Sequence, residues 1–275
     1  MKRAELTKLT IQKLAEKPEA KAEGEWIVSL CLNVKRSNVY SQDSVMQEEI
    51  DAVNNAVEQR LKNVPLDYIF GKSNFYGFDL VVNPNVLIPR PETEELVEKV
   101  SKEITYKDKV LDIGTGSGAI AIAIQKLTNA KVFAVDISQG ALEVAKQNAK
   151  NNNADIEFVL SDLFENIKEE KFNYIISNPP YISNEEYELL QNEVKDYEPI
   201  TALVAEENGL AIYKRIIKDA PNFLEENGRI VFEIGCTQAQ AITKMLEKDF
   251  VNIEVYKDFA GLDRVVCATL NTRRK

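Results

Sequence analysis

The spacing of hydrophobic residues divides the chain into an N-terminal helical part and a longer part in which strands and helices alternate. In residues 47–62 apolar side chains recur at intervals of three and four, which places them on one face of a helix: Ile50, Val53, Val57 and Leu61. Residues 25–34 predict a second and more apolar helix. We therefore expect residues 1–73 to form a small helical domain.

The hydrophobic period changes to two after residue 73, as is typical of strands. Phe78, Leu80 and Val82 alternate with other residues. The sequence Asn83-Pro84-Asn85 then predicts a turn, and apolar residues 86–88 follow it. Residues 74–90 are therefore interpreted as a β-hairpin that links the helical domain to the next one.

From residue 109 onward, short apolar strands alternate with helices. Strands are predicted at 109–113, 131–136, 156–161, 172–177 and 229–234, and helices at 119–127, 140–151 and 210–219. This alternation predicts an α/β fold with a doubly wound, Rossmann-like parallel sheet over residues 91–275. Residues 252–256 and 264–270 leave no room for a helix between them, so we expect these two strands to form an antiparallel hairpin at the sheet edge.

Composition narrows the possible chemistry. The sequence has no histidine, which excludes catalytic Ser-His and Cys-His pairs and most transition-metal centres. The three cysteines, Cys31, Cys236 and Cys267, are far apart, which disfavours a zinc site or a disulfide framework and fits a reducing cytosol. We expect no metal, and the reaction must use amides, carboxylates, tyrosine, backbone groups or a cofactor.

Charge and hydropathy narrow the possible partners. A formal net charge of -10 opposes binding to the phosphates of DNA or RNA and favours proteins with basic surfaces. The N-terminal segment is charged and amphipathic, and no apolar run reaches about 18 residues. We expect a soluble cytoplasmic protein with no direct DNA binding and no membrane partner.

A glycine-rich turn lies between the first strand of the predicted sheet and the following helix: Gly114, Thr115, Gly116, Ser117 and Gly118. Glycines there permit a tight backbone and let a ligand approach the helix N-terminus. Doubly wound sheets bind ligands at the carboxyl ends of their strands. The turn also satisfies the dinucleotide fingerprint GxGxx(G/A), so by itself it leaves a dinucleotide and S-adenosylmethionine equally open.

Two acidic residues follow the next strands. Asp136 ends the second strand, where its carboxylate can accept both hydroxyls of a cofactor ribose, or where it can cap a helix. Asp162 follows the third strand, and its carboxylate or a nearby backbone group can take an adenine amino group while Leu163 covers the ring. Alternatively, Asp162 is an exposed loop residue and Leu163 belongs to the core, with no ligand bound by either.

The loop Asn178-Pro179-Pro180-Tyr181 follows the fourth strand and should lie beside the glycine-rich turn. Its prolines forbid a helix and remove two N–H donors, so the loop offers carbonyl acceptors. The Asn178 side-chain oxygen and the Pro179 carbonyl can accept the two N–H bonds of a planar amine or amide, which localises the nitrogen lone pair. Tyr181 can stack on that group or wall the pocket. The alternative is a rigid turn that closes a strand.

The glycine-rich turn followed by Asn-Pro-Pro-Tyr resembles the amino-methyltransferases with a class I Rossmann-like fold. Further stretches resemble the HemK-type release-factor glutamine methyltransferases within that group: 65–71, 87–94, 197–199 with 208–210, 232–235 and 261–264. The likeness extends from about residue 60 to about residue 270, with a similarly placed helical domain before it.

The resemblance implies a protein-(glutamine-N5) methyltransferase that uses S-adenosyl-L-methionine and acts on the Gly-Gly-Gln loop of class I peptide chain release factors. It implies that residues 114–118 and Asp136 hold the cofactor and that Leu163 stands at a cofactor-contacting position, beside Asp162, which we expect at the cofactor from its place after the third strand. It also implies that residues 178–181 hold the glutamine amide, with Asn178 beside the cofactor as well, and that the helical domain helps to recognise the release factor. Leu163 departs from the family pattern, in which this residue is often tryptophan.

Three other functions are compatible with parts of the sequence. A glutamine methyltransferase for a ribosomal protein would share most motifs, and the Pro-Glu-Thr-Glu of residues 91–94 favours the release-factor enzyme. A nucleic-acid amino-methyltransferase would share Asn-Pro-Pro-Tyr, but the acidic chain argues against it. A dinucleotide-binding oxidoreductase or nucleotide sensor would use the glycine-rich turn and leave residues 178–181 without a function.

Overall fold

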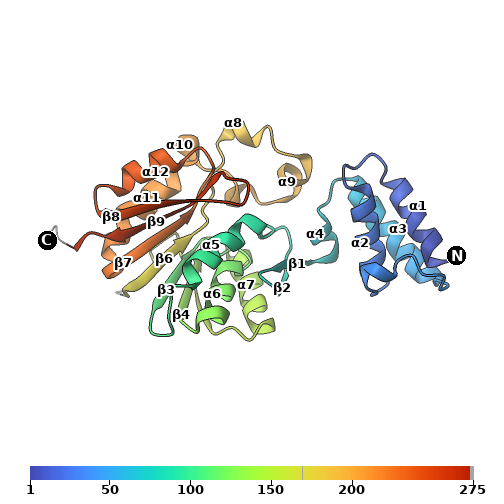
Figure 1. Cartoon of the computed structure of the whole chain (residues 1–275), viewed down its shortest axis with the longest axis horizontal. Coiled ribbons are helices and arrows are strands. Elements are labelled where there is room, and N and C mark those ends of the chain that lie inside the picture. Colours follow the sequence, from blue (N-terminus) through green and yellow to red (C-terminus); the bar gives the residue numbers. More distant parts are fainter. Residues whose placement is uncertain (169, 273–275) are drawn as a thin grey trace. The chain divides into compact units, whose positions relative to one another are not determined.

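A computed structural model describes residues 1–168 and 170–272. Their contacts divide the chain into two compact units. The first comprises Met1–Gly71 together with Asn192–Tyr197, and the second comprises Lys72–Gln191 and the chain from Glu198 onward (Figure 1). In the described part of the chain, no helix is both long and apolar enough to cross a membrane.

The first unit is helical, and its bounds are α1 Arg3–Lys13, α2 Ala20–Cys31, α3 Gln47–Leu61, α4 Leu66–Phe70 and the short α9 Asn192–Tyr197. The apolar stripe predicted for α3 contributes Val53 and Val57 to a core that also contains Ile27 and Val28 of α2. Gly71 ends α4 in the left-handed conformation, with φ 65°, which is the usual role of glycine after a helix.

The inclusion of α9 in the helical unit departs from the prediction that residues 91–275 form one domain. The carboxylate of Glu193 lies 2.7 Å from the guanidinium of Arg60, and the Tyr197 hydroxyl donates to the Lys62 carbonyl at 2.8 Å. Arg60 is also bound by Glu23 of α2, so the segment joins an existing buried ion pair. Hydrophobic periodicity reports local structure and carries no sign of such a return of the chain.

The linker contains the predicted hairpin, but its turn lies elsewhere. Strands β1 Lys72–Phe75 and β2 Phe78–Val81 pair antiparallel and are joined by Tyr76 and Gly77. Both turn residues have positive φ, 51° and 81°, which matches the twist of a two-residue hairpin. The prediction of a hairpin turn at Asn83–Asn85 is therefore wrong, and residues 86–88 form no strand although Val86 and Ile88 are buried.

The second unit contains a seven-stranded sheet in the order β5-β4-β3-β6-β7-β9-β8. Its strands are β3 Lys109–Ile113, β4 Lys131–Asp136, β5 Ile156–Leu160, β6 Phe172–Ser177, β7 Leu224–Glu233, β8 Phe250–Lys257 and β9 Asp263–Leu270. The first five are parallel, and β9 pairs antiparallel with β7 and β8 at one edge. The predicted Rossmann-like fold with an antiparallel edge is confirmed.

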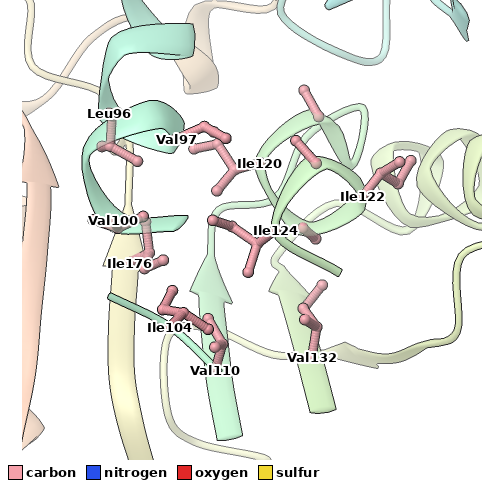
Figure 2. Packing of buried hydrophobic residues seen from close by; sticks show 14 of the residues in the cluster. Leu96, Val97, Val100, Ile104, Val110, Ile120, Ile122, Ile124, Val132 and Ile176 are labelled. Atoms are coloured by element: carbon pink, nitrogen blue, oxygen red, sulfur yellow. The ribbon is translucent and has the colours of Figure 1, made fainter. Parts of the chain in front are cut away.

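Helices cover both faces of this sheet. Helices α5 Pro91–Ser101, α6 Ala119–Thr128 and α7 Gln139–Asn151 lie on one face, and α11 Ala211–Asp219 and α12 Ala239–Leu246 lie on the other. Successive strand residues alternate between the two cores, so that Val110 packs with the first set and Leu111 with the second. Figure 2 shows the first core, where Val97 of α5 lies beside Ile120 of α6.

The strand order reverses between β3 and β6. The chain passes from β3 to β4 and β5 on one side, and then returns to place β6 on the other side of β3. The loops that follow β3 and β6 consequently diverge at neighbouring carboxyl ends and leave a crevice, where ligands of doubly wound sheets bind. Short helices α8 Asn184–Tyr187 and α10 Glu206–Gly209 lie in the connection between β6 and α11.

Candidate active site

A cavity of about 350 Å³ lies at this crevice, within the size range of small-molecule sites. Its lining contains most of the residues that the sequence singles out: Gly114, Thr115, Gly116, Ser117, Asp136, Asp162, Leu163, Asn178, Pro179 and Pro180. Gly118 and Tyr181 lie outside the set of described residues that line it. The four loops at the carboxyl ends of β3, β4, β5 and β6 therefore converge on one site.

The glycine-rich turn takes a shape that only glycine adopts without strain. Gly114, Gly116 and Gly118 have φ values of 72°, 55° and 83°. A Cβ on Gly118 would lie 3.2 Å from the Cβ of Ala145, so this glycine lets α6 pack closely on α7. Gly114 and Gly116 have open space at the same position, which leaves room for a ligand against their backbone.

Asp136 holds the glycine-rich turn in place. Its Oδ2 accepts from the Gly116 N–H at 2.8 Å and its Oδ1 accepts from the Ser138 N–H at 2.9 Å. Burial raises the pKa of the Asp136 carboxyl, and these two hydrogen bonds oppose that shift. The Ile137 N–H also stabilises the ionised carboxyl, and the carboxylate has a lone-pair site left for a hydroxyl donor. The side chain that caps α7 belongs to Ser138, which accepts from the Ala141 N–H at 3.2 Å.

Asp162 and Leu163 lie at the β5 end of the cavity. The carboxylate of Asp162 lies 2.8 Å from the guanidinium of Arg215, which extends from α11 and also lines the cavity. Leu163 has a φ of 50°, an uncommon conformation for a residue with a branched side chain. Arg215 was not expected from the sequence, because nothing in its local pattern distinguishes it from a surface arginine of an amphipathic helix.

The loop after β6 is held rigidly. The Asn178 side-chain nitrogen donates to the Thr93 hydroxyl at 3.2 Å, and Pro179 is buried. The Tyr181 carbonyl accepts from the Gln238 side-chain amide at 2.9 Å. A Cβ on Gly209 would lie only 1.9 Å from that carbonyl oxygen, so a glycine is required where α10 passes the loop.

The Tyr181 ring packs against the core on the α11 side of the sheet. Burial raises the pKa of its hydroxyl to about 12, and the nearby Glu233 adds to this shift. The phenol is therefore neutral at physiological pH. Tyr181 is not among the described residues that line the cavity. That it stacks on the substrate amide or walls the pocket therefore stays a prediction.

Several stretches that the sequence resemblance selected meet behind this loop. Thr93 lies in the stretch 87–94 and Glu233 lies in the stretch 232–235. The Thr93 hydroxyl donates to the Glu233 carboxyl at 2.6 Å. Arg90, also from 87–94, pairs with the buried Glu198 of 197–199. Arg264, from 261–264, donates to the Ile234 carbonyl and pairs with Asp258. These contacts join α5, β7 and β9 to the loop that follows β6.

Glu233 has no assigned role in the sequence analysis, although the sequence contains a signal. It ends an apolar strand and is 1% exposed. Burial raises the pKa of its carboxyl to about 7, against the hydrogen bond from Thr93 and the attraction of Arg264. A carboxyl at the end of a buried strand is costly to desolvate, and such groups gather at functional sites.

Comparisons with known proteins agree with this geometry. Residues 91–196 match the methyltransferase small domain, and residues 5–71 match the PrmC N-terminal domain. Release factor glutamine methyltransferases from Enterococcus faecalis and Geobacter sulfurreducens are 42% and 39% identical to this chain. The first alignment covers 84% of each chain, and the second covers 92% of this chain and 91% of the relative.

Solved structures share the fold at low sequence identity. A methyltransferase from Pyrococcus furiosus has a TM-score of 0.56 and 18% identity, over 79% of this chain and 98% of its own. The resemblance, the methyltransferase class and the Rossmann-like fold predicted from the sequence are confirmed. The chain belongs to the family of release factor glutamine methyltransferases.

Proposed function

We propose that this protein transfers a methyl group from S-adenosyl-L-methionine to the side-chain amide nitrogen, N5, of the glutamine in the Gly-Gly-Gln loop of class I peptide chain release factors. The observation that carries the proposal is the orientation of Asn178 at the cavity. Its nitrogen donates to Thr93 and it also hydrogen-bonds the Glu233 carboxyl. The described residues supply no donor to its Oδ1, which is the acceptor that a substrate amide needs.

The cavity suits S-adenosylmethionine. The backbone at Gly114 and Gly116 faces open space, and the Asp136 carboxylate has a lone-pair site left for a ribose hydroxyl. Leu163, Ile212 and Arg215 line the end of the cavity where an adenine would lie. When bound, S-adenosylmethionine supplies an electrophilic methyl group together with its own leaving group. The remaining work of this chain is to hold and orient the nucleophile.

The nucleophile needs help because the lone pair of an amide nitrogen is delocalised into the carbonyl. Asn178 Oδ1 and the Pro179 carbonyl accept the two N–H bonds of the glutamine amide, which draws density onto nitrogen and aims the lone pair at the methyl group. The prolines at 179 and 180 have no N–H groups that could compete for these acceptors. The methylated amide keeps one N–H and releases the other proton.

The release factor also requires a binding surface away from the reacting amide. The helical unit, which matches an N-terminal domain model over residues 5–71, contributes that surface in this proposal. The net charge of -10 favours a partner with basic surface. Because release factors act on ribosomes, the proposal places the reaction in the cytoplasm.

Methyl transfer from tritiated S-adenosylmethionine tests the substrate directly. Purified release factor, ribosomal protein and DNA are offered side by side, together with a release factor whose Gly-Gly-Gln glutamine is replaced by glutamate. Label should enter the wild-type release factor and be absent from the glutamate variant. Label that enters ribosomal protein or DNA while the release factor stays unlabelled contradicts the proposal.

A further inference from the structure

A chain of three polar side chains leads from the interior of the second unit to the cavity. The Asn178 nitrogen donates to Thr93 Oγ1 at 3.2 Å, and the Thr93 hydroxyl donates to Glu233 Oε2 at 2.6 Å. Thr93 and Glu233 are 5% and 1% exposed. The three residues come from α5, the end of β7 and the loop after β6, and they are far apart in the sequence.

The charge of Glu233 fixes which atoms donate and which accept in these hydrogen bonds. An ionised carboxyl can only accept, so the single hydroxyl hydrogen of Thr93 must point toward Glu233. Thr93 Oγ1 then has only lone pairs to offer to Asn178, and the side-chain NH₂ group faces both these lone pairs and the Glu233 carboxyl, to which it also hydrogen-bonds. Asn178 Oδ1 is consequently turned away from Thr93, where it is available to the substrate amide.

We infer that Thr93 and Glu233 are positioning residues that fix which end of the Asn178 side-chain amide faces the substrate. The inference rests on the proposed function, since it explains how the amide acceptor is presented. A side-chain amide has two ends of almost equal size, and packing alone distinguishes them poorly. A buried carboxylate distinguishes them by charge, at the cost of desolvating that charge.

Protonation of Glu233 allows the order of donors and acceptors in these hydrogen bonds to reverse. A neutral carboxyl can donate to Thr93, and Thr93 can then donate to Asn178 Oδ1, which leaves the NH₂ group facing the donors of the substrate. The charged and titratable groups that face Glu233 are Arg264 of β9, Glu92 of α5, Tyr181 and Tyr213. Arg264 favours the ionised carboxyl but also pairs with Asp258. Burial outweighs it and raises the pKa of Glu233 to about 7.

The first test compares two substitutions at Thr93. Thr93→Val keeps the shape and removes the hydroxyl, and Thr93→Ser keeps the hydroxyl and removes a methyl group. We expect Thr93→Val to lower kcat for release-factor methylation by about 10²-fold, as for loss of a preorganised polar group. Thr93→Ser should stay within a few-fold of wild type, and both variants should bind S-adenosylhomocysteine normally by calorimetry.

Thr128→Val is a matched control, because Thr128 caps the far end of α6 through its own backbone contacts. It should leave kcat unchanged. A folded Thr93→Val protein with wild-type kcat overturns the inference while the proposed function stands. An inactive wild type instead contradicts the proposed function.

The second test is the pH profile. The kcat of wild type should fall as pH decreases through about 7, because the required form of Glu233 is the ionised one. Glu233→Gln has no such titration, so its lower kcat should not show this acidic limb. An identical acidic limb in wild type and Glu233→Gln overturns the assignment of Glu233.

The third test needs no substrate. The side-chain NH₂ resonances of Asn178, identified by their loss in Asn178→Asp, should shift in wild type as Glu233 titrates between about pH 5.5 and about pH 8.5. The shift should persist in Thr93→Ser and disappear in Glu233→Gln. Resonances that stay constant over this range in wild type overturn the coupling, whatever the methyl-transfer assay shows.

Discussion

Replacing Glu233 with glutamine should stabilise the protein at alkaline pH even though it lowers the activity. The carboxyl is 1% exposed, so folding at high pH must take its charge out of water. The pKa of Glu233 is raised from an ordinary value of 4.5 to about 7 by that burial. The proton is therefore bound more tightly in the folded protein than in the unfolded chain.

The magnitude follows from the shift in pKa. Raising the pKa of Glu233 from 4.5 to about 7 corresponds to roughly 3 kcal/mol of destabilisation by the charged form. This destabilisation is present in full above the folded pKa of about 7 and absent below the unfolded value of 4.5. Between these limits the free energy of unfolding rises as the pH falls. The neutral amide of glutamine avoids this destabilisation. The pKa of about 7 already includes the opposing hydrogen bond from Thr93, so a net gain of up to about 3 kcal/mol is expected at alkaline pH.

Urea unfolding of wild type and Glu233→Gln at about pH 8.5 and about pH 5 measures this effect. The difference in free energy of unfolding should favour the variant at the higher pH and shrink at the lower one. Glu225→Gln, on the exposed part of the same strand, is the control and should change the stability little at either pH. A Glu233→Gln protein that is less stable than wild type at about pH 8.5 would refute the reasoning.

Two further predictions concern the backbone around the cavity. Asp136→Ala removes an acceptor for the ribose and also the acceptor that holds the Gly116 N–H. S-adenosylhomocysteine should therefore bind about 10- to 100-fold more weakly in calorimetric titration. Unchanged affinity would exclude this role of Asp136. Gly209→Ala places a Cβ 1.9 Å from the Tyr181 carbonyl oxygen, so it should lower the melting temperature and the methylation rate. The control Gly261→Ala has nearly the same φ, 80° against 78°, and open space around the Cβ, so equal losses in both variants would show that backbone strain alone is responsible.

Much of the second unit could be predicted from local sequence. The β3, β4 and β6 strands match their predicted ranges residue for residue, because the mostly buried strands of a parallel sheet are short apolar runs between turn residues. The glycine-rich turn was found for a similar reason, since three closely spaced glycines after a strand indicate a backbone that other residues cannot adopt. Both signals lie within a few residues.

The features that were missed depend on the conformation of single residues or on distant contacts. Proline and asparagine favour turns and therefore predict the hairpin turn at Asn83–Asn85, but Tyr76 adopts a positive φ of 51° beside Gly77. The pairing of Glu193 with Arg60, and that of Thr93 with Glu233, join residues more than a hundred positions apart. Periodicity over short windows carries no information about such contacts.

The central claim is that Asn178 presents its oxygen to the amide of a release-factor glutamine. The most direct measurement is the single-turnover rate of methyl transfer to purified release factor by Asn178→Ala, with folding and S-adenosylhomocysteine binding confirmed beforehand. Loss of the acceptor should lower this rate by about 10²- to 10³-fold. Asn178→Asp, which keeps an acceptor of similar volume, should fall between the alanine variant and wild type. A folded Asn178→Ala protein that methylates the release factor at close to the wild-type rate would contradict the account.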